Sequence, residues 1–235
     1  MDDKIIYSFK RYEKKYCLNR EELRLFIEKI SPYMKKDKFG RYTIENIYYD
    51  TDDWRLVRAS IEKPVYKEKL RIRSYGMPAN DDNIFVEIKK KYKGVVYKRR
   101  ISTAPDAAER FLSQGISVPE YGQIGREIAW FQSFYRTKPK IFIGYDRMAF
   151  AGIEDPDLRI TFDSNLRYRT YDLDLRLGDY GMHVLAPDEF IMEIKVCGAC
   201  PLWLCRVISE VGARQISFSK IGCCYKKILG GNSCA

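Results

Sequence analysis

Charged residues alternate with apolar residues in six short segments of this chain, and this alternation is the pattern that could do chemistry. The segments are Arg11–Lys15, Lys69–Arg73, Glu87–Lys89, Tyr145–Arg147, Arg159–Asp163 and Glu193–Lys195. Side chains on a β-strand point to opposite faces with a period of two, so each segment predicts a charged face and an apolar face. A half-buried sheet with its charged face in water explains any single segment. Because the charges are mainly cationic and recur in nearly every predicted strand, a surface that binds a polyanion is the alternative.

Phosphate chains need several fixed cations, and the planar guanidinium of arginine can hold two oxygens at once. The predicted charged faces supply Lys69, Arg71, Arg73, Lys89, Lys98, Arg100, Arg147 and Arg159. If the strands close into a barrel, these cations line its interior, where they repel one another and are costly to desolvate. A bound polyphosphate or nucleotide would relieve that repulsion.

Three glutamates on these faces, Glu13, Glu87 and Glu193, are candidate ligands for a divalent metal. Magnesium is commonly held by one or two protein carboxylates together with phosphate oxygens and water, and it neutralises a phosphoryl group during transfer. A glutamate next to a lysine on one strand face can instead form a cross-strand charge pair. Both interpretations stay open for Glu13 and Glu87, whereas for Glu193 we favour metal binding.

Composition indicates a folded domain with anionic partners. The 235 residues are 46% hydrophobic, and 42 Lys+Arg against 32 Asp+Glu give a net charge of +10. These values argue against disorder and favour nucleotides, polyphosphate, nucleic acid or an acidic membrane surface as partners. No segment approaches the ~20 apolar residues of a membrane helix, and the first residues lack the apolar core of a secretory signal. We therefore expect a soluble, cytoplasmic protein.

Other chemistries have weak sequence support. Seven cysteines and no export signal predict reduced thiols, and Cys197–Cys200 has a CxxC spacing that raises zinc or redox roles. No second CxxC follows and His183 is the only histidine, so small apolar or loop cysteines are the simpler interpretation. Nucleophile-elbow, dinucleotide-binding and P-loop motifs are absent. The acidic residues of Asp50–Asp53 are most simply a cap for a short helix through residue 60.

The coarse pattern predicts an α+β fold in one domain, residues 1–235, with a flexible tail at 230–235. An antiparallel barrel fits the count of about eight strands. The expected strands lie near 6–17, 44–50, 66–75, 84–92, 94–102, 140–149, 158–168 and 190–196, with a tight turn at Lys93-Gly94. Helices are expected at 19–31, capped by Asn19, and at 105–114, 123–135, 201–211 and 218–229.

At these residues the chain resembles the polyphosphate polymerase domain of the vacuolar transporter chaperone family, a branch of the triphosphate tunnel metalloenzymes. The matching motifs, in order, are Phe9–Tyr16, Ile47–Asp50, Leu70–Gly76, Phe85–Lys89, Tyr145–Arg147, Leu158–Asp163, Met192–Lys195 and Phe218–Lys220. The resemblance implies an eight-stranded antiparallel β-barrel tunnel with peripheral helices. It also implies transfer of the terminal phosphate of ATP to a growing polyphosphate chain, with Mn2+ or Mg2+.

The resemblance also assigns roles to residues. It implies that phosphates are gripped by Lys15, Arg71, Arg73, Lys89, Arg147 and Arg159, with Lys98 as an addition and with Tyr145, Ser219 and Lys220 completing the grip. Lys69, Lys195 and Arg11 extend the same predicted charged faces. Of these residues, Arg71, Arg73, Lys89, Arg147, Arg159 and Lys220 are the expected catalytic set. Glu193 is the implied metal ligand, with Glu13 and Glu87 as the further candidates.

One departure from the wider superfamily favours the polymerase branch. That superfamily often begins with Glu-x-Glu-x-Lys, whereas this chain reads Arg11-x-Glu13-x-Lys15. ATP with inorganic polyphosphate or pyrophosphate are the expected partners, and nucleic acid is not expected. The alternatives are a hydrolase of tripolyphosphate or nucleoside triphosphates, and a non-catalytic binder of polyphosphate, nucleotide or RNA. The sensing domain and membrane helices of eukaryotic relatives are absent, so we expect no translocation by this chain itself.

Overall fold

The computed structural model describes residues 11–93, 95–114 and 119–231, and it divides into two compact units. Unit 1 comprises the described parts of residues 1–41, 148–163 and 188–217. Unit 2 comprises the described parts of residues 42–147, 164–187 and 218–235. Three long strands run from one unit into the other, namely β2 (Met34–Asp50), β6 (Lys138–Gly152) and β7 (Arg159–Arg169). Each unit is described by itself below.

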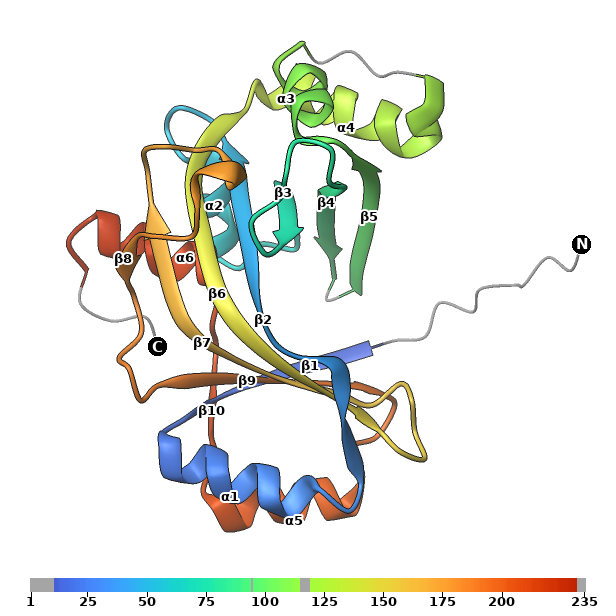
Figure 1. The fold of residues 1–235 in the computed structure, drawn as a ribbon, viewed down its shortest axis with the longest axis vertical. Helices are drawn as coiled ribbons and strands as arrows, with labels where there is room; N and C mark the ends of the chain where they lie inside the picture. Colours follow the sequence, from blue (N-terminus) through green and yellow to red (C-terminus); the bar gives the residue numbers. More distant parts are fainter. Residues whose placement is uncertain (1–10, 94, 115–118, 232–235) are drawn as a thin grey trace, which may run out of the picture. The chain divides into compact units, whose positions relative to one another are not determined.

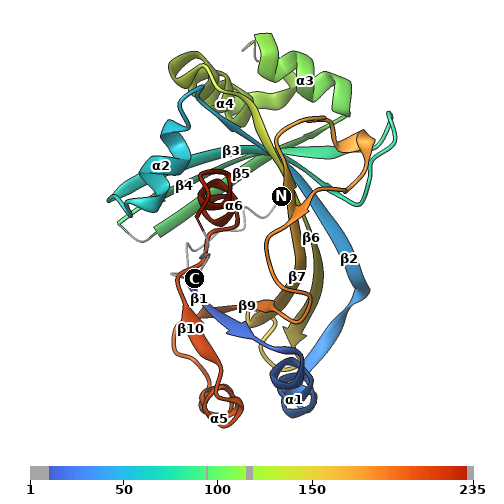
Figure 2. The same ribbon diagram turned by 90° about the vertical axis from the view of Figure 1, so that its left-hand side faces the viewer.

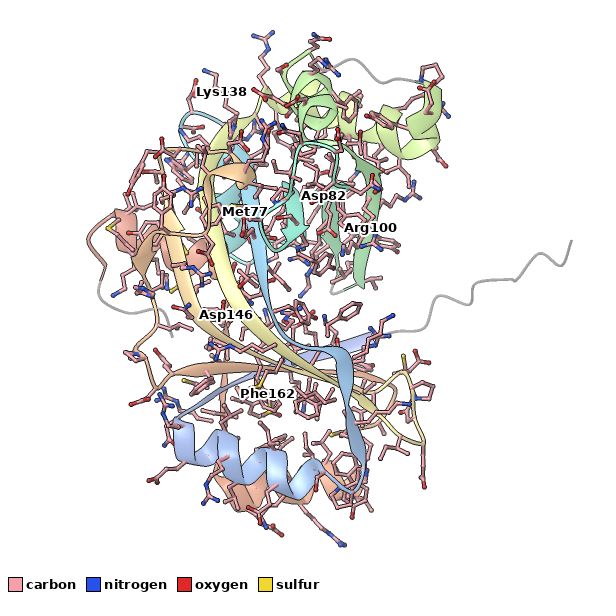
Figure 3. The ribbon with its side chains drawn as sticks, viewed as in Figure 1. Met77, Asp82, Arg100, Lys138, Asp146 and Phe162 are labelled. Atoms are coloured by element: carbon pink, nitrogen blue, oxygen red, sulfur yellow. The ribbon has the colours of Figure 1, made fainter. Side chains whose placement is uncertain are left out.

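Unit 1 is an antiparallel sheet packed against two helices. Its strands follow the order β10-β1-β9-β7, where β1 is Arg11–Leu18, β9 is Phe190–Cys197 and β10 is Arg214–Ile216. Helices α1 (Arg20–Ile30) and α5 (Leu202–Val211) contact each other and are labelled in Figure 2. Their apolar faces share a core with Tyr16, Met192 and Phe162, the last of which is labelled in Figure 3. The apolar residues of these strands therefore lie on one face, as the alternation predicts.

Helix α1 begins where the sequence indicates. The side chain of Asn19 accepts a hydrogen bond from the backbone N–H of Glu22, and the Glu22 carboxylate accepts one from the Asn19 N–H. This reciprocal capping box satisfies two backbone donors that the first turn of a helix leaves without partners.

Unit 2 contains a second antiparallel arrangement, in the order β6-β2-β3-β4-β5 (Figure 1). Strand β3 is Tyr66–Tyr75, β4 is Ile84–Tyr92 and β5 is Val95–Thr103, and the two-residue β8 (Met182–His183) pairs with β7. Helices α3 (Pro105–Gln114) and α4 (Gly122–Tyr135) contribute to a core with Leu70, Val86 and Ile88. The remaining helical elements are α2 (Arg55–Ile61), α6 (Lys220–Ile228) and the 3-10 turns Pro119–Tyr121 and Leu175–Leu177.

The strand register of unit 2 separates an apolar face from a charged face. Leu70 pairs with Ile88, and both belong to the core that α3 and α4 help to form. Arg71 pairs with Glu87, so both side chains leave the strands on the opposite face. This face carries the charged residues of the alternating segments, among them Lys69, Arg71, Glu87 and Lys89.

Most expected elements are confirmed, and the main differences concern strands. The described chain has ten strands, of which β8 and β10 were not expected, and β2 begins at Met34 rather than near residue 44. The start of β2 reads Lys35-Lys-Asp-Lys38, which offers no apolar alternation to detect. A mainly antiparallel sheet with helices is confirmed. Its closure into a tunnel stays a prediction, as does the single-domain boundary, and residues 232–235 of the expected tail lie outside the described residues.

The helix cap expected at Asp50 is also present in the structure. The carboxylate of Asp50 accepts backbone N–H groups of Leu56 and Val57, which confirms that it caps α2. In the described residues no group of three or more metal-ligating side chains gathers at the CxxC segment or elsewhere. Five of the described cysteines are free thiols, as expected. Among the described helices, none has the length and apolar character needed to span a membrane.

Glu45 is a buried carboxylate that lies outside the charged face. It is 1% exposed, and its Oε2 has no hydrogen-bond partner in the described structure. Burial and the nearby charge of Asp179 raise the pKa of Glu45 to about 7, against the opposing effect of Arg167 and Arg169. A carboxyl with a raised pKa stabilises the fold below its unfolded pKa, and this contribution is lost as the pH rises through about 7.

We expect Glu45→Gln to remove a pH-dependent loss of stability. Between pH 5 and pH 8.5 the wild type should lose on the order of 2 kcal/mol more of its free energy of unfolding than the variant. The reason is that Glu45 has to ionise in a buried site over this range, whereas the amide of the variant does not titrate. Urea unfolding at both pH values measures the difference. Glu62→Gln, at an exposed position after α2, is the matched control. Parallel pH profiles for wild type and Glu45→Gln would contradict the assignment.

Candidate phosphate-binding site

A dense group of cations occupies the charged face of β3, β4 and β5. Lys69, Lys89 and Lys98 are direct neighbours across the three strands, and Arg71, Glu87 and Arg100 form the next row. We define these six residues together with Arg73 as the cationic cluster. Like charges placed directly opposite each other destabilise a sheet. The cluster therefore needs carboxylates or a bound anion to offset its repulsion.

Glu87 lies at the centre of the cationic cluster. Its Oε2 accepts hydrogen bonds from Nε and Nη2 of Arg71 at 2.8 and 2.7 Å, and Nε of Arg73 lies 3.8 Å from the same oxygen. Nζ of Lys98 is 2.6 Å from Oε1. With three cations around it and 1% exposure, Glu87 forms charge pairs here, which is one of the two interpretations left open by the sequence.

The pKa values of the cluster reflect this arrangement. Burial raises the pKa of Glu87, but Arg71, Arg73 and Lys98 together lower it to about 2. Burial lowers the pKa of Lys98, while Glu87 acts in the opposite direction. Glu87 is therefore ionised above about pH 2, and its contribution to stability is lost progressively as the pH falls from its ordinary pKa of 4.5 through the folded pKa of about 2.

Neutral side chains fix the orientation of the two arginines. Nη1 of Arg71 donates to the Tyr48 hydroxyl at 2.8 Å, and Nε of Arg73 donates to Oδ1 of Asn46 at 2.8 Å. Nη2 of Arg73 donates to the Tyr145 hydroxyl at 3.1 Å. These bonds use only some of the five N–H groups of each guanidinium, so donors are left for phosphate oxygens. No role was expected for Tyr48 and Asn46, although their period-two spacing on β2 placed them on one face.

The start of α6 and strand β6 bring further expected residues together. Nζ of Lys220 lies 4.4 Å from the centre of the Tyr145 ring, and the guanidinium of Arg147 lies 5.3 Å from it. Nζ of Lys69 donates to Oγ of Ser219 at 3.1 Å. Ser219 is also the N-cap of α6, because its Oγ accepts the backbone N–H of Gly222. Unit 2 therefore gathers Lys69, Tyr145, Arg147, Ser219 and Lys220 within one network.

The remaining expected residues lie in unit 1, on the strand face opposite its core. Glu193 pairs in register with Lys15 on β1 and with Thr161 on β7. Nζ of Lys195 is 2.7 Å from Glu193, and Nζ of Lys15 is 3.9 Å from Glu193 and 3.3 Å from Glu13. Arg159 pairs in register with Lys195. The side chain of Arg11 lies outside the described residues, so its expected role stays a prediction.

A metal would have to use oxygen donors at this face. Glu193 and Glu13 supply carboxylates, and the buried Oγ1 of Thr161 has no hydrogen-bond partner among the described atoms. Hard oxygen donors of this number suit a divalent cation that completes its shell with phosphate and water. The described residues contain no group of three or more carboxylate, histidine or cysteine ligands, so an all-protein cage is not built there. The donor set therefore fits Mg2+ or Mn2+ bound together with substrate.

The chain is similar to known proteins in sequence and in fold. The family model described as the VTC domain matches residues 10–229. The chain is 27% identical over 203 residues to vacuolar transporter chaperone complex subunit 4 of Schizosaccharomyces pombe. That alignment covers 73% of this chain and 28% of the yeast protein, so the chain spans less than a third of that relative's length.

Solved structures resemble the fold over nearly its full length. A putative adenylyl cyclase from Hippeastrum, described as having a dominant triphosphatase activity, has a TM-score of 0.55 at 17% identity and covers 94% of this chain and 98% of its own. Putative adenylate cyclases from Vibrio parahaemolyticus and Bacillus halodurans give TM-scores of 0.52 and 0.54 at 15% and 14% identity. They cover 95% and 88% of this chain, and 98% and 92% of their own. At these identities the likeness concerns the fold alone.

We expect Glu87→Gln to destabilise the ligand-free chain by about 3 kcal/mol, because three cations would lose their shared carboxylate in a buried site. Tripolyphosphate should raise the melting temperature of the variant more than that of the wild type, since it replaces the missing negative charge. Differential scanning calorimetry with and without tripolyphosphate measures both effects. Glu120→Gln, at an exposed position, is the control. An unchanged ligand-free melting temperature for Glu87→Gln would refute the role given to Glu87.

Proposed function

This chain belongs to the VTC domain family, and we propose that it is a polyphosphate polymerase that transfers the γ-phosphate of ATP to a growing inorganic polyphosphate chain. The observation that carries the proposal is the cationic cluster, in which fixed arginines surround a single central carboxylate. Such a surface can hold a chain of phosphates along its length. The similarity to subunit 4 of the yeast chaperone complex supports a polyphosphate-related substrate.

Phosphoryl transfer places little covalent demand on a protein, and positioning with charge stabilisation provides most of the catalysis. In the proposed reaction an oxygen at the end of the acceptor chain attacks the γ-phosphorus of ATP. A new P–O bond forms as the bond to the β-phosphate oxygen breaks, and ADP leaves with the electron pair. Arg71 and Arg73 would hold the phosphoryl oxygens during this exchange.

The two arginines are suited to this task because they are already oriented. Tyr48 fixes Arg71, while Asn46 and Tyr145 fix Arg73, so neither guanidinium has to reorganise as charge develops. We propose that Lys69, Lys89 and Lys98 attract the rest of the phosphate chain. Arg147, Lys220 and Ser219 would complete the grip around Tyr145. Lys15, Lys195 and Arg159 of unit 1 would provide further phosphate contacts.

We propose Glu193 as the principal ligand of a divalent cation, with Glu13 as the second carboxylate. When bound, Mg2+ or Mn2+ would neutralise phosphate charge and favour in-line geometry. Nζ of Lys195, 2.7 Å from Glu193, would have to exchange this contact for one with phosphate. Glu87 is the less suitable ligand because its two oxygens already contact three cations.

The first experiment is a polymerisation assay with purified protein, ATP and Mn2+, with and without a polyphosphate primer, resolved on a gel by chain length. We expect a lengthening ladder. Arg71→Lys should reduce its rate at least about tenfold, because lysine keeps the charge but cannot form the two-pronged contact. Arg20→Lys, in an exposed ion pair with Asp188, is the matched control. Full activity in Arg71→Lys would contradict the catalytic role of this arginine.

We expect Glu193→Gln to weaken the dependence of the reaction on metal. The Mn2+ concentration for half-maximal rate should rise by about tenfold, because amide oxygen is a poorer ligand for a hard cation than carboxylate. Glu28→Gln, on the exposed surface of α1, is the control. An unaltered metal titration would refute the assignment to Glu193. Released phosphate without a ladder would identify a hydrolase, and binding without turnover would identify a binding protein.

A further inference from the structure

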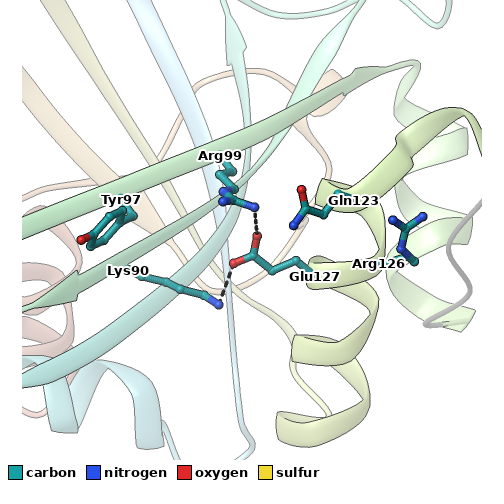
Figure 4. Close-up of a pocket in the computed structure, with 6 residues that line it drawn as sticks. All are labelled: Lys90, Tyr97, Arg99, Gln123, Arg126 and Glu127. Atoms are coloured by element: carbon teal, nitrogen blue, oxygen red, sulfur yellow. Dashed lines mark hydrogen bonds and ion pairs between the residues drawn. The ribbon is translucent and has the colours of Figure 1, made fainter. Parts of the chain in front are cut away.

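A second group of cations lies on the opposite face of β4 and β5, beside the first turns of α4. It lines a cavity of about 460 Å³ formed by Lys90, Tyr97, Arg99, Gln123, Arg126 and Glu127. Lys90 and Arg99 follow Lys89 and Lys98 in the chain, so the alternation along each strand directs them away from the cationic cluster. Figure 4 shows Glu127 reaching from α4 toward both of them.

Three of the six side chains that line this cavity are exposed and have no partner among the residues that the structure describes. Glu127 is 2.7 Å from Nζ of Lys90 and 3.2 Å from Nη1 of Arg99, and Lys90 is also 3.6 Å from Glu68. In the described part of the chain, Arg126, Tyr97 and Gln123 make no side-chain hydrogen bond or ion pair. Polar groups that converge on a concave surface without using their donors indicate a ligand site.

The charge balance favours an anion. Glu127 pairs with Lys90 and Arg99. Glu87 pairs with Arg71 and Lys98 in the same way. Arg126 adds a positive charge that forms no ion pair with a carboxylate among the described residues. The cavity also adjoins the N-terminal turn of α4, whose N-cap residue Tyr121 provides no side-chain hydrogen bond. The helix dipole adds positive potential at that end. Two arginines offer planar forks that match phosphate oxygens.

We propose that this cavity is a second binding site for a triphosphate, separate from the cationic cluster. Its ligand is either ATP or a short inorganic polyphosphate, which share the same phosphate chemistry. Arg99 and Arg126 hold phosphate oxygens, and Gln123 donates its amide N–H. Tyr97, which is 52% exposed, offers an aromatic surface on which an adenine base can stack. The site does not depend on catalysis at the cluster, so it stands whether the chain is a polymerase, a hydrolase or a binding protein.

Isothermal titration calorimetry of the full chain with tripolyphosphate, without divalent metal, tests the proposal. We expect two sites for the wild type. Arg126→Ala should weaken one of them about tenfold or more, because a charge-assisted hydrogen bond to phosphate is lost. Arg110→Ala removes the same charge from an exposed position on α3 and should leave both sites intact. A circular-dichroism melt confirms that each variant folds.

A cluster variant separates the second site from the proposed function. Arg71→Lys should weaken the other site and leave the site at Arg126 unchanged. The proposal is overturned if the wild type has a single site that Arg126→Ala does not affect, or if Arg110→Ala weakens binding as much as Arg126→Ala. Loss of polymerase activity in the gel assay bears on the cluster alone, so the two failures are distinguishable.

Titration with ATP identifies the source of the triphosphate. If the ligand is the nucleotide, Tyr97→Ala weakens ATP binding at this site but not tripolyphosphate binding. If the ligand is inorganic polyphosphate, Tyr97→Ala leaves both affinities unchanged. Either result supports the site. Failure of both anions to bind in an Arg126-dependent way overturns it.

Discussion

The charged face of unit 2 depends on the contact between one buried carboxylate and three cations. Two unit charges 4 Å apart interact by about 4 kcal/mol at the effective dielectric of a protein surface, so without Glu87 the repulsion among Arg71, Arg73 and Lys98 would destabilise this face. One carboxylate does not neutralise the six cations of the cluster. The face therefore keeps an excess of positive charge while its arginines stay fixed. This combination suits an anion with many oxygens better than a single carboxylate or phosphate.

The strand period places cations on both faces of strands β4 and β5. Along β5, Lys98 and Arg100 belong to the cluster, and the guanidinium of Arg100, labelled in Figure 3, lies 4.3 Å from the centre of the Phe85 ring. Tyr97 and Arg99 point to the cavity beside α4. Glu87 contacts three cations at the first face and Glu127 contacts two at the second, and both places leave further donors open. A run of adjacent basic residues on a strand thus acts as two separate surfaces rather than one.

The sequence predicted elements well where the apolar period was continuous. Helix α3 has the expected bounds. Strands β3 and β4 also have the expected bounds, because Leu70 and Ile72 on β3 and Val86 and Ile88 on β4 alternate with charged residues without interruption. The short β8 and β10 and the first half of β2 carry no such period, and they form because neighbouring strands offer backbone partners. Such pairing partners are distant in sequence, which is why local pattern could not reveal them.

The sequence predicted which charged residues belong to the candidate site, but not which side chains they contact. Alternation placed Arg71 and Arg73 on one face of their strand and Lys98 and Arg100 on one face of theirs, since this follows from strand period alone. It could not show that Tyr48 and Asn46 from β2 hold the arginines, because strand order and register decide that contact. The convergence of the unit 1 and unit 2 residues on one tunnel stays a prediction for the same reason.

Glu87 and Glu193 show how environment, rather than residue type, separates a structural carboxylate from a candidate metal ligand. Both sit on charged strand faces between basic residues. Arg71 donates two hydrogen bonds to Oε2 of Glu87 and is itself held by Tyr48, so a cation could approach this oxygen only by displacing a fixed guanidinium. Glu193 contacts flexible lysines, and beside it Thr161 has a buried hydroxyl without a hydrogen-bond partner. Lysine can turn away toward phosphate at little cost, whereas a guanidinium that is also bonded to Tyr48 cannot. These differences are why we propose Glu193, and not Glu87, as the ligand of a metal that binds together with phosphate.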